Sequence, residues 1–272
     1  MHADKRGREF YILAIFFGLF VLFLYGPLSA ILILSFQGPN GGLTFPLNGV
    51  SLHWFVNLFE KQAVGDFGGS FRRSLFLGIA VMAVTVVVAL LAGLAFRRKF
   101  AGATALFYLS VASLVVPSII ISLGIGVLFQ QVGLQPAWYS SAFGAHLTWT
   151  LPFGVLIMFA VFNRFSPAYE EAARDLGASS WQTFAHVVLP MIAPSLIGVG
   201  LFGFTLSYDE FARTLMTSGT YNTLPLEIYG MTTNVTTPVL YALGTVTTVF
   251  SFLVIAGTLG LIVMMNRRRA RG

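Results

Sequence analysis

The sequence contains no cysteine, and only 10% of its 272 residues are charged. The absence of cysteine excludes disulfides, thiolate metal sites and cysteine nucleophiles, and it leaves the redox compartment undetermined. A soluble domain usually carries about a quarter charged residues. Because the chain is 56% hydrophobic, it cannot cover a globular surface with polar groups, and its composition indicates a protein of the lipid bilayer.

Patterns typical of catalysis and metal binding are also missing. The histidines have no metal-ligand spacing, so we expect no metal site. No Ser-His-Asp arrangement, nucleophile elbow or Walker motif is visible, which disfavours an enzyme. The net charge of +6 comes from short basic clusters at the ends of apolar runs. This clustering is typical of membrane topology and disfavours nucleic acid as a partner.

Six apolar runs are long enough to cross a membrane, since about 20 residues span the hydrocarbon core. We therefore expect an all-α, polytopic protein that forms a single membrane domain over residues 1–272. The expected spans cover residues 10–36, 74–96, 103–129, 142–162, 191–216 and 238–265. The first run is longer than the roughly 7 to 15 apolar residues of a signal peptide, so we expect an uncleaved span.

Prolines and polar segments divide these runs. Pro117 interrupts the third span, where it removes a helix hydrogen bond and predicts a kink. Residues 53–55, His-Trp-Phe, indicate an interfacial helix before the second span. The Thr-rich segment 218–237 is expected to be an outer loop.

The basic residues predict that both termini face the cytoplasm. Twelve of the sixteen Lys and Arg residues fall in segments that would then be cytoplasmic, and three fall in outer segments. The twelve are Lys5, Arg6, Arg8, Arg97, Arg98, Lys99, Arg164, Arg174, Arg267, Arg268, Arg269 and Arg271. The outer three are Lys61, Arg72 and Arg73; the last two either snorkel to the headgroups or face a docking partner.

The longest polar passage, residues 163–190, separates the fourth and fifth spans. The Ser166-Pro167 pair predicts a helix start, because Ser caps free amides and Pro suits the first turn. Glu170 and Glu171 then lie near the positive end of the helix dipole. Gly177 is expected to end this helix, because glycine adopts positive φ at little cost.

A second short helix is expected directly afterwards. Ser179 and Gln182 have the spacing of a capping box, in which each side chain bonds the backbone of the other residue. Pro190 is expected to stop this second helix before the fifth span begins. The passage is therefore predicted to be helix, bend, helix, outside the lipid.

These residues carry a family resemblance. The pattern Glu171-Ala172-Ala173, Gly177, Val187 and Leu189-Pro190 resembles the EAA loop in the permease subunits of bacterial ABC importers, with Val187 in place of the usual Ile. The resemblance implies the type I (MetI-like) permease fold and a loop that docks into a groove of the ATP-hydrolysing subunit. The residues to which it assigns coupling are Glu170, Glu171, Ala172, Ala173, Asp175, Gly177, Ala178, Leu189 and Pro190.

The resemblance covers nearly the whole chain and is greatest to the second permease of spermidine/putrescine-type importers. The residues that carry it are Tyr25-Gly26-Pro27, Ser35-Phe36, Leu151-Pro152-Phe153, Asp175 to Ser179, Phe204 to Glu210 and Leu224-Pro225-Leu226. It implies a bacterial inner membrane location and, as partners, a second permease, two ATPase subunits and an external substrate-binding protein, periplasmic or extracellular. ATP and Mg would be bound by the ATPase subunits, so this chain would hold no cofactor and hydrolyse nothing.

Three charged residues of the expected fifth span are costly in lipid and should face protein or water. Asp209 and Arg213 are four apart, so on a helix they would share a face and pair, while Glu210 would point about 100° away. Either one carboxylate lines the pathway and attracts a cationic substrate, or the group is an ion pair that fixes a helix contact. The pathway candidates are Ser118, Ser207, Tyr208, Asp209, Glu210 and Arg213.

The substrate class stays open at this point. In related polyamine permeases the residue after the proline of the third span is often acidic, whereas here Ser118 follows Pro117. This missing carboxylate and the added Arg213 make a zwitterion or an organic anion, such as an opine, an amino acid derivative or a phosphonate, an alternative to a polyamine. An ion channel or an ion-coupled secondary transporter is a more distant alternative, although we find no convincing pair of inverted repeats.

Overall fold

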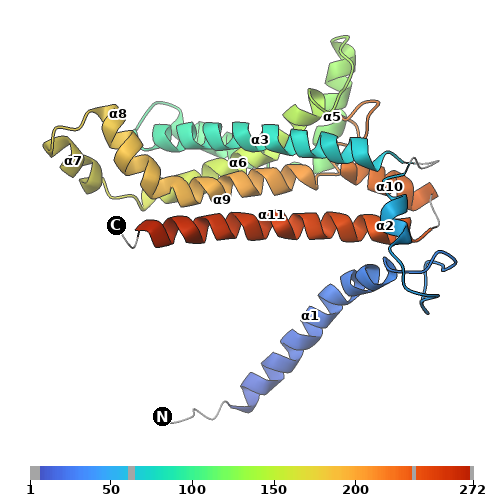
Figure 1. Ribbon diagram of the computed structural model, residues 1–272. Coiled ribbons are helices and arrows are strands. Elements are labelled where there is room, and N and C mark those ends of the chain that lie inside the picture. Colours follow the sequence, from blue (N-terminus) through green and yellow to red (C-terminus); the bar gives the residue numbers. More distant parts are fainter. Residues whose placement is uncertain (1–6, 61–64, 235–236, 270–272) are drawn as a thin grey trace. The chain divides into compact units, whose positions relative to one another are not determined.

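The computed structural model describes residues 7–60, 65–234 and 237–269 (Figure 1). These residues form helices, connecting loops and one isolated bridge between Gln37 and Val50, which confirms the all-α class. Of the helices described, five are long and apolar enough to cross a membrane. They are α1 (Arg8–Leu34), α3 (Phe67–Phe96), α6 (Ser141–Asn163), the helix Ser180–Tyr208, and α11 (Val239–Arg269).

The expected third span consists of two shorter helices, α4 (Ala103–Ala112) and α5 (Ser118–Gln131). Pro117 is the N-cap of α5, which confirms that the proline interrupts this span. The interruption is a non-helical passage through residues 113–117 and not only a kink. The count of six spans stays a prediction.

The chain packs as two units. The described parts of Met1–Gly65 and Gly230–Phe250 form the first, and those of Asp66–Tyr229 and Ser251–Gly272 form the second. In the first unit the predicted interfacial helix is present as α2 (His53–Asn57). The Tyr241 hydroxyl donates to the Leu43 carbonyl at 2.6 Å, which fastens α11 to the loop after α1. The basic residues Lys5, Arg6, Lys61 and Arg271, which entered the topology prediction, lie outside the described residues.

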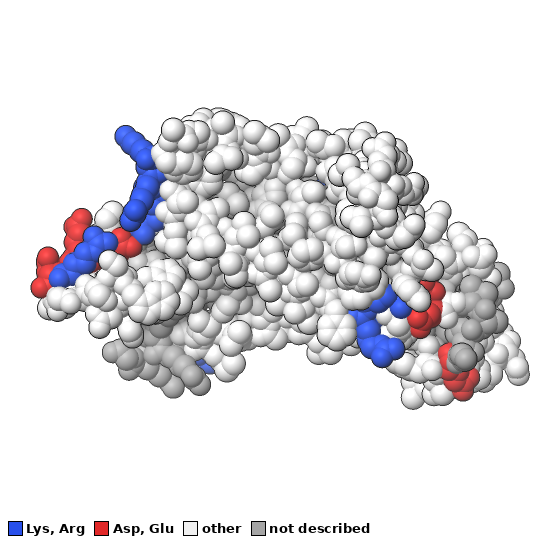
Figure 2. Space-filling view, turned by 90° about the horizontal axis from the view of Figure 1, so that it is seen from above, with Lys and Arg blue, Asp and Glu red and all other residues white. Residues whose placement is uncertain are grey.

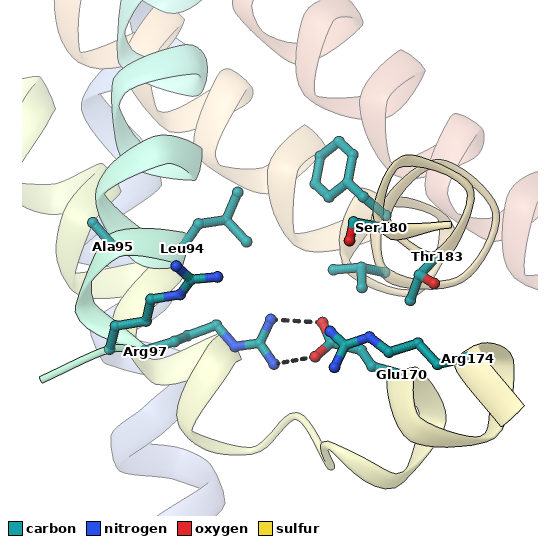
Figure 3. A pocket seen from close by; sticks show the side chains of 10 residues that line it. Leu94, Ala95, Arg97, Glu170, Arg174, Ser180 and Thr183 are labelled. Carbon is teal, nitrogen blue, oxygen red and sulfur yellow. Dashed lines mark hydrogen bonds and ion pairs between the residues drawn. The ribbon is translucent and has the colours of Figure 1, made fainter. Parts of the chain in front are cut away.

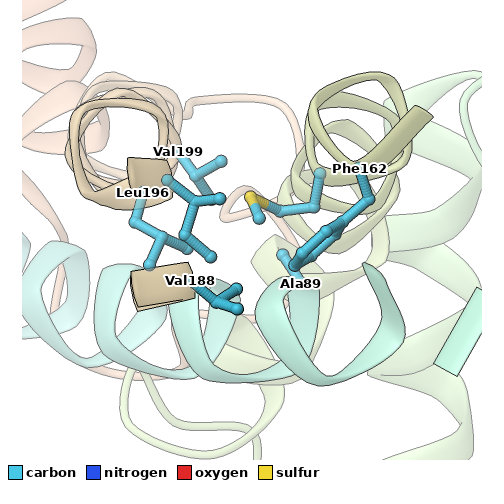
Figure 4. Packing of buried hydrophobic residues seen from close by; sticks show 7 residues of the cluster. Ala89, Phe162, Val188, Leu196 and Val199 are labelled. Atoms are coloured by element: carbon cyan, nitrogen blue, oxygen red, sulfur yellow. The ribbon is translucent and has the colours of Figure 1, made fainter. Parts of the chain in front are cut away.

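The core of the second unit lies where α3, α6 and α9 (Leu189–Tyr208) pack together. Figure 4 shows Ala89 of α3 and Phe162 of α6 packed with Leu196 and Val199 of α9 and with Val188, the residue just before α9. The Thr85 hydroxyl donates to the Thr150 hydroxyl at 3.0 Å in the buried interface of α3 and α6. Without water to drive helices together, such close packing and interhelical hydrogen bonds are what hold a membrane bundle.

Gly154 allows α6 to approach its neighbours closely. A Cβ atom at this position would lie 2.9 Å from the Ala89 Cβ, 3.0 Å from a Thr85 methyl and 3.3 Å from a Val199 methyl. None of these atoms is the end of a flexible side chain, so a methyl group at residue 154 would push the helices apart.

The end of the fifth span is a correction. We expected a span to residue 216, but α9 ends at Tyr208 and Asp209 is its C-cap. Beyond it, polar side chains satisfy the local backbone: Glu210 Oε1 accepts from the Arg213 N–H at 2.9 Å, and the Thr214 hydroxyl donates to the Glu210 carbonyl. Such bonds compete with continued helix formation.

The expected outer loop 218–237 contains the helix α10 (Leu224–Asn234), which the sequence analysis did not predict; that the segment lies outside stays a prediction. Pro225 and Glu227 stand in its first turn, where proline has no amide to leave unpaired and a carboxylate favours the positive end of the helix dipole. These start signals outweigh the polar composition of the segment.

Pro190 does not stop the helix before the fifth span, contrary to expectation. The helices α8 (Ser180–Thr183), η1 (Phe184–Val188) and α9 form one continuous helix, with the π-helical turn η1 immediately before the proline. Because a proline cannot donate to the preceding turn, a local widening to π geometry accommodates it without ending the helix.

Gly154→Ala is expected to destabilise the protein by about 1–3 kcal/mol, the cost of overpacking a core. Gly144→Ala is the matched control on the same helix, because a Cβ there meets nothing within 4 Å. Thermal unfolding in detergent, followed by tryptophan fluorescence, should show a lowered midpoint for Gly154→Ala alone. Equal midpoints for the two variants would contradict this account of the core.

Candidate functional site

The polar passage forms a corner, residues 168–183, made of α7 (Ala168–Asp175), a short turn and α8. Pro167 is the N-cap of α7 and no side chain caps it, so the predicted capping role of Ser166 is wrong. Pro167 has helical dihedrals, and its carbonyl accepts from the Glu170 amide at 2.9 Å, so the backbone itself satisfies this amide. Glu170 and Glu171 stand in the first turn as predicted.

Gly177 ends α7 as predicted, with φ of +84°. The Ala178 amide donates to the Ala173 carbonyl at 3.0 Å, and the Gly177 amide donates to the Arg174 carbonyl at 2.8 Å. This pair of bonds is a Schellman motif, which needs a left-handed residue at its centre and therefore favours glycine.

The capping box that starts α8 is confirmed. The Ser179 amide donates to the Gln182 side chain at 2.8 Å, and the Gln182 amide donates to the Ser179 hydroxyl at 3.3 Å. Because one motif ends α7 and the other begins α8 two residues later, the local bonds fix the angle of the corner.

The corner presents apolar side chains outward. Leu176 is 90% exposed and Trp181 is 72% exposed, one on each side of the Gly177 turn. Both are large apolar residues, and the sequence alone gives no sign that they lack a packing partner within this chain. Of the predicted coupling residues, Glu171, Ala172, Asp175, Gly177 and Pro190 are also exposed, while Glu170, Ala173, Ala178 and Leu189 are half-buried.

An ion pair fastens α7 to the end of α3. Arg97 Nη1 and Nη2 donate to Glu170 Oε1 and Oε2 at 2.7 and 2.9 Å, a bidentate contact that Figure 3 shows as two parallel bonds. The Arg97 guanidinium also lies over the rings of Phe162 and Phe165, at 5.2 and 5.4 Å from their centroids. Hydrogen bonds from Arg97 lower the pKa of Glu170 below its ordinary value. Sequence reasoning missed this pair because 73 residues separate its members.

Charged side chains gather at two ends of the face seen in Figure 2, and an uncharged surface separates them. In the second unit, one group contains Arg97, Arg98, Glu170 and Arg174, beside the corner. At the other end of α3, Arg73 donates to the Asn222 carbonyl at 2.7 Å and pairs with Asp66 at 3.3 Å. Arg73 therefore binds within its own chain, whereas Arg72 is exposed and donates to the Gly68 carbonyl of its own helix at 3.2 Å.

A second polar group, which we call the Arg213 cluster, lies where the chain leaves α9. Arg213 is only 1% exposed. Its Nη1 donates to the Ser118 hydroxyl at 2.7 Å and to Glu210 Oε2 at 3.4 Å, and its Nε donates to the Thr148 hydroxyl at 3.3 Å. The guanidinium carbon lies 4.6 Å from the centroid of the Trp149 ring. The side chain thus ties the segment after α9 to the start of α5 and to α6.

The pairing inside this cluster corrects the sequence prediction. Arg213 pairs with Glu210 and not with Asp209. Because α9 ends at Tyr208, the helical spacing of four residues on which the prediction rested does not apply here. Glu210 is buried, whereas Asp209 is exposed and no ion pair among the described residues holds its carboxylate. Asp209 stands at the negative end of the α9 dipole, where a carboxylate is disfavoured and a cation is favoured.

The other pathway candidates are buried. The Ser207 hydroxyl lies 2.8 Å from His146 Nδ1, within hydrogen-bonding distance. Tyr208 stacks on Phe204 with 5.6 Å between ring centroids, and both side chains are buried. The structure therefore brings together Ser118, Glu210 and Arg213, and leaves Asp209 as the accessible charge.

In residues 7–60, 65–234 and 237–269, no three His, Asp or Glu side chains gather to hold a metal ion.

Comparison with known proteins shows which family and which relatives this chain is similar to. Residues 85–270 match the family described as "Binding-protein-dependent transport system inner membrane component". The chain is 29% identical over 230 residues to the spermidine/putrescine transport system permease protein PotC of Haemophilus influenzae, covering 84% of this chain and 88% of that protein. It is 27% identical over 235 residues to PotC of Escherichia coli K12, covering 86% and 87%.

The fold is similar to a chain in the crystal structure of a bacterial ABC transporter involved in the import of the acidic polysaccharide alginate. The TM-score is 0.65, the sequence identity is 17%, and the likeness covers 95% of this chain and 99% of that chain. This similarity concerns the fold alone.

Breaking the Arg97–Glu170 pair is expected to lower the free energy of unfolding by about 1–2 kcal/mol, since a charged hydrogen-bonded pair is lost. Arg97→Glu and Glu170→Arg should each destabilise, and the double variant should recover part of the loss. Because the pKa of Glu170 is lowered, the contribution of the pair is full above the ordinary value of 4.5 and is lost as the pH falls through the lowered value.

Thermal unfolding of the detergent-solubilised protein as a function of pH measures this contribution. Glu171→Gln is the matched control, because Glu171 is exposed and adjacent. A double variant no more stable than the single variants would show that the pair does not fasten α7.

Proposed function

The chain belongs to the family of inner membrane components of binding-protein-dependent transport systems, and from this premise we propose that it forms half of a translocation pathway for a cationic amine. The chain is a permease component of an ABC importer. The family match and the similarity to the PotC proteins confirm the resemblance drawn from the sequence, including the relation to spermidine/putrescine permeases. In the proposed complex it pairs with a second permease and with two ATPase subunits, and it receives its substrate from an external binding protein. ATP and Mg are bound by the ATPase subunits and not by this chain.

The corner is the proposed contact with the ATPase subunit. Its angle is fixed by the Schellman motif at Gly177 and by the capping box at Ser179. Its exposed Leu176 and Trp181 offer the apolar surface that a protein partner would bury. The EAA residues Glu171, Ala172 and Ala173 lie on the helix that leads into this turn.

The corner and the proposed pathway belong to one element. The helix Ser180–Tyr208 is continuous over 29 residues, which is roughly 40 Å at 1.5 Å per residue. It begins at the corner and ends next to Asp209. A displacement of the corner by the ATPase subunits would therefore move this carboxylate directly.

The proposal of a cationic substrate rests on one observation: the Glu210 carboxylate is buried and paired, whereas the Asp209 carboxylate is exposed. Glu210 neutralises Arg213 inside the protein, so the added arginine does not oppose a cation in the pathway. Asp209 stays exposed at the negative end of α9. A cation there is attracted both by the carboxylate and by the negative end of the helix dipole. The Ser118 hydroxyl, which stands where related polyamine permeases often have an acidic residue, accepts a hydrogen bond from the Arg213 guanidinium and so takes part in burying that charge. A polyamine-type amine fits this arrangement better than an organic anion.

The proposed orientation places both termini and the corner in the cytoplasm of a bacterial inner membrane. The pair Arg97–Glu170 places the end of α3 and the start of α7 at one side of the second unit. Arg97, Arg98, Lys99, Arg164 and Arg174 all belong to these connections, which supports a cytoplasmic side by the distribution of basic residues.

Gly177→Val is expected to abolish most transport while leaving the permease in the membrane. A branched residue at positive φ costs about 1–2 kcal/mol and distorts the corner. Gly102→Val is the matched control, because Gly102 has φ of +87° and, like Gly177, has open space around it. The measurement is ATP-driven uptake by the complex in proteoliposomes. Equal uptake by both variants would rule out the corner as the coupling element.

Asp209→Asn is expected to reduce spermidine or putrescine uptake roughly tenfold, since one charged contact contributes about 1.5–3 kcal/mol. Asp209→Glu should retain much of the uptake, because it keeps the charge. Uptake is measured over a range of substrate concentrations in the same proteoliposomes. Unchanged uptake by Asp209→Asn, or preferential uptake of an opine or a phosphonate by the wild type, would refute the cationic pathway.

A further inference from the structure

A cavity of about 560 Å³ lies in the second unit, between the end of α3 and the corner. Figure 3 shows its lining from both sides: Leu94, Ala95 and Arg97 come from α3 and the residue after it, and Glu170 and Arg174 come from α7. Its volume falls within the range of small-molecule sites, which is roughly 300–1,000 Å³.

The cavity carries excess positive charge. Three arginines line it, Arg97, Arg98 and Arg174, against the single carboxylate of Glu170. The bidentate bond to Arg97 occupies both oxygens of that carboxylate. In the part of the chain that the structure describes, Arg98 and Arg174 form no ion pair, so two guanidinium groups are available to an anion.

The remaining lining is suited to a phosphate group attached to an apolar chain. Ser180 adds a hydroxyl donor, and Phe184 and Val188 of η1 form an apolar wall opposite Leu94. Guanidinium groups bind phosphate oxygens with paired, charge-assisted hydrogen bonds. The site therefore combines an anion-binding side and an apolar side.

Its position relative to α3 points to the membrane surface. An apolar stripe on α3, Val87, Leu91 and Leu94, leads along one helix face to the cavity, since these residues are spaced by four and three. Val87 and Leu91 are exposed, as lipid-facing residues are. The arginines follow where the apolar helix ends, at the depth at which basic side chains meet lipid headgroups.

From this lining we propose that the cavity binds a phosphate-bearing anion, supplied by an anionic phospholipid whose headgroup sits between Arg98 and Arg174. The acyl chains follow the stripe on α3. The bound lipid contacts both α3 and the corner and stabilises their contact beside the Arg97–Glu170 pair. This inference does not depend on the transported substrate.

The test is lipid binding to the purified transporter complex, counted by native mass spectrometry after exchange into phosphatidylglycerol or phosphatidylcholine. The wild type should retain phosphatidylglycerol at least about tenfold more strongly than phosphatidylcholine, given the contribution of two arginines near the surface. Arg98→Gln/Arg174→Gln should lose this preference. Lys99→Gln/Arg164→Gln, which removes two exposed charges outside the cavity, should keep it.

A second arm separates the two sources of phosphate. Inorganic phosphate is titrated onto the wild type and the double variant in phosphatidylcholine nanodiscs and is followed by phosphorus NMR. Saturable binding to the wild type alone, without retention of phosphatidylglycerol, would assign the cavity to free phosphate. Arg98→Gln alone, at an exposed side chain, serves if the double variant fails to assemble.

The proposal is overturned if the wild type retains both lipids equally and binds no phosphate. It is also overturned if Arg98→Gln/Arg174→Gln and Lys99→Gln/Arg164→Gln lose phosphatidylglycerol to the same extent. The second result would mean that the total charge of the surface attracts the lipid and that the cavity does not.

Discussion

The guanidinium of Arg213 is buried, and a buried charge needs a counter-charge and hydrogen-bond partners. The contacts at the end of α9 supply them. An uncompensated charge in an apolar interior costs several kcal/mol. Glu210 supplies the counter-charge, Ser118 and Thr148 supply acceptors, and the Trp149 ring covers the guanidinium. These contacts join α5, α6 and the segment after α9. The helix α9 ends at Tyr208, and beyond it the Glu210 side chain also accepts a hydrogen bond from the Arg213 amide.

The two neighbouring carboxylates at the end of α9 therefore have different roles. Glu210 and Arg213 neutralise each other inside the protein. Asp209, one residue before Glu210, is exposed at the negative end of the helix. At the other end of the same element, the corner is fixed by backbone motifs and by Arg97–Glu170. The continuous helix Ser180–Tyr208 connects the two ends, so the proposed coupling surface and the proposed pathway share one helix.

Close packing of the bundle supports this continuous helix. Gly154 and Ala89 let α3, α6 and α9 approach closely, and the threonine pair of α3 and α6 satisfies its hydroxyls inside the interface. The π-helical turn η1 accommodates Pro190 without a break. A break at Pro190 would have separated the corner from the transmembrane part of the helix, which is why this departure from the sequence expectation matters for the proposed mechanism.

The sequence by itself determined the features that depend on neighbouring residues or on composition. The apolar runs predicted an all-α membrane protein, Pro117 predicted the interruption of the third span, and Gly177 and the Ser179–Gln182 spacing predicted the bend. The local sequence was insufficient where two signals compete. Hydropathy predicted a span to residue 216, but polar side chains after Tyr208 end the helix there. Pro190 predicted a helix end, but the π-helical turn before it lets the helix continue. Contacts between distant residues were decided only by the tertiary structure. The bonds from Arg213 to Ser118 and Thr148, the bond from Arg97 to Glu170 and the basic cavity beside it all depend on how separate helices meet, and no periodicity along one chain segment specifies that meeting.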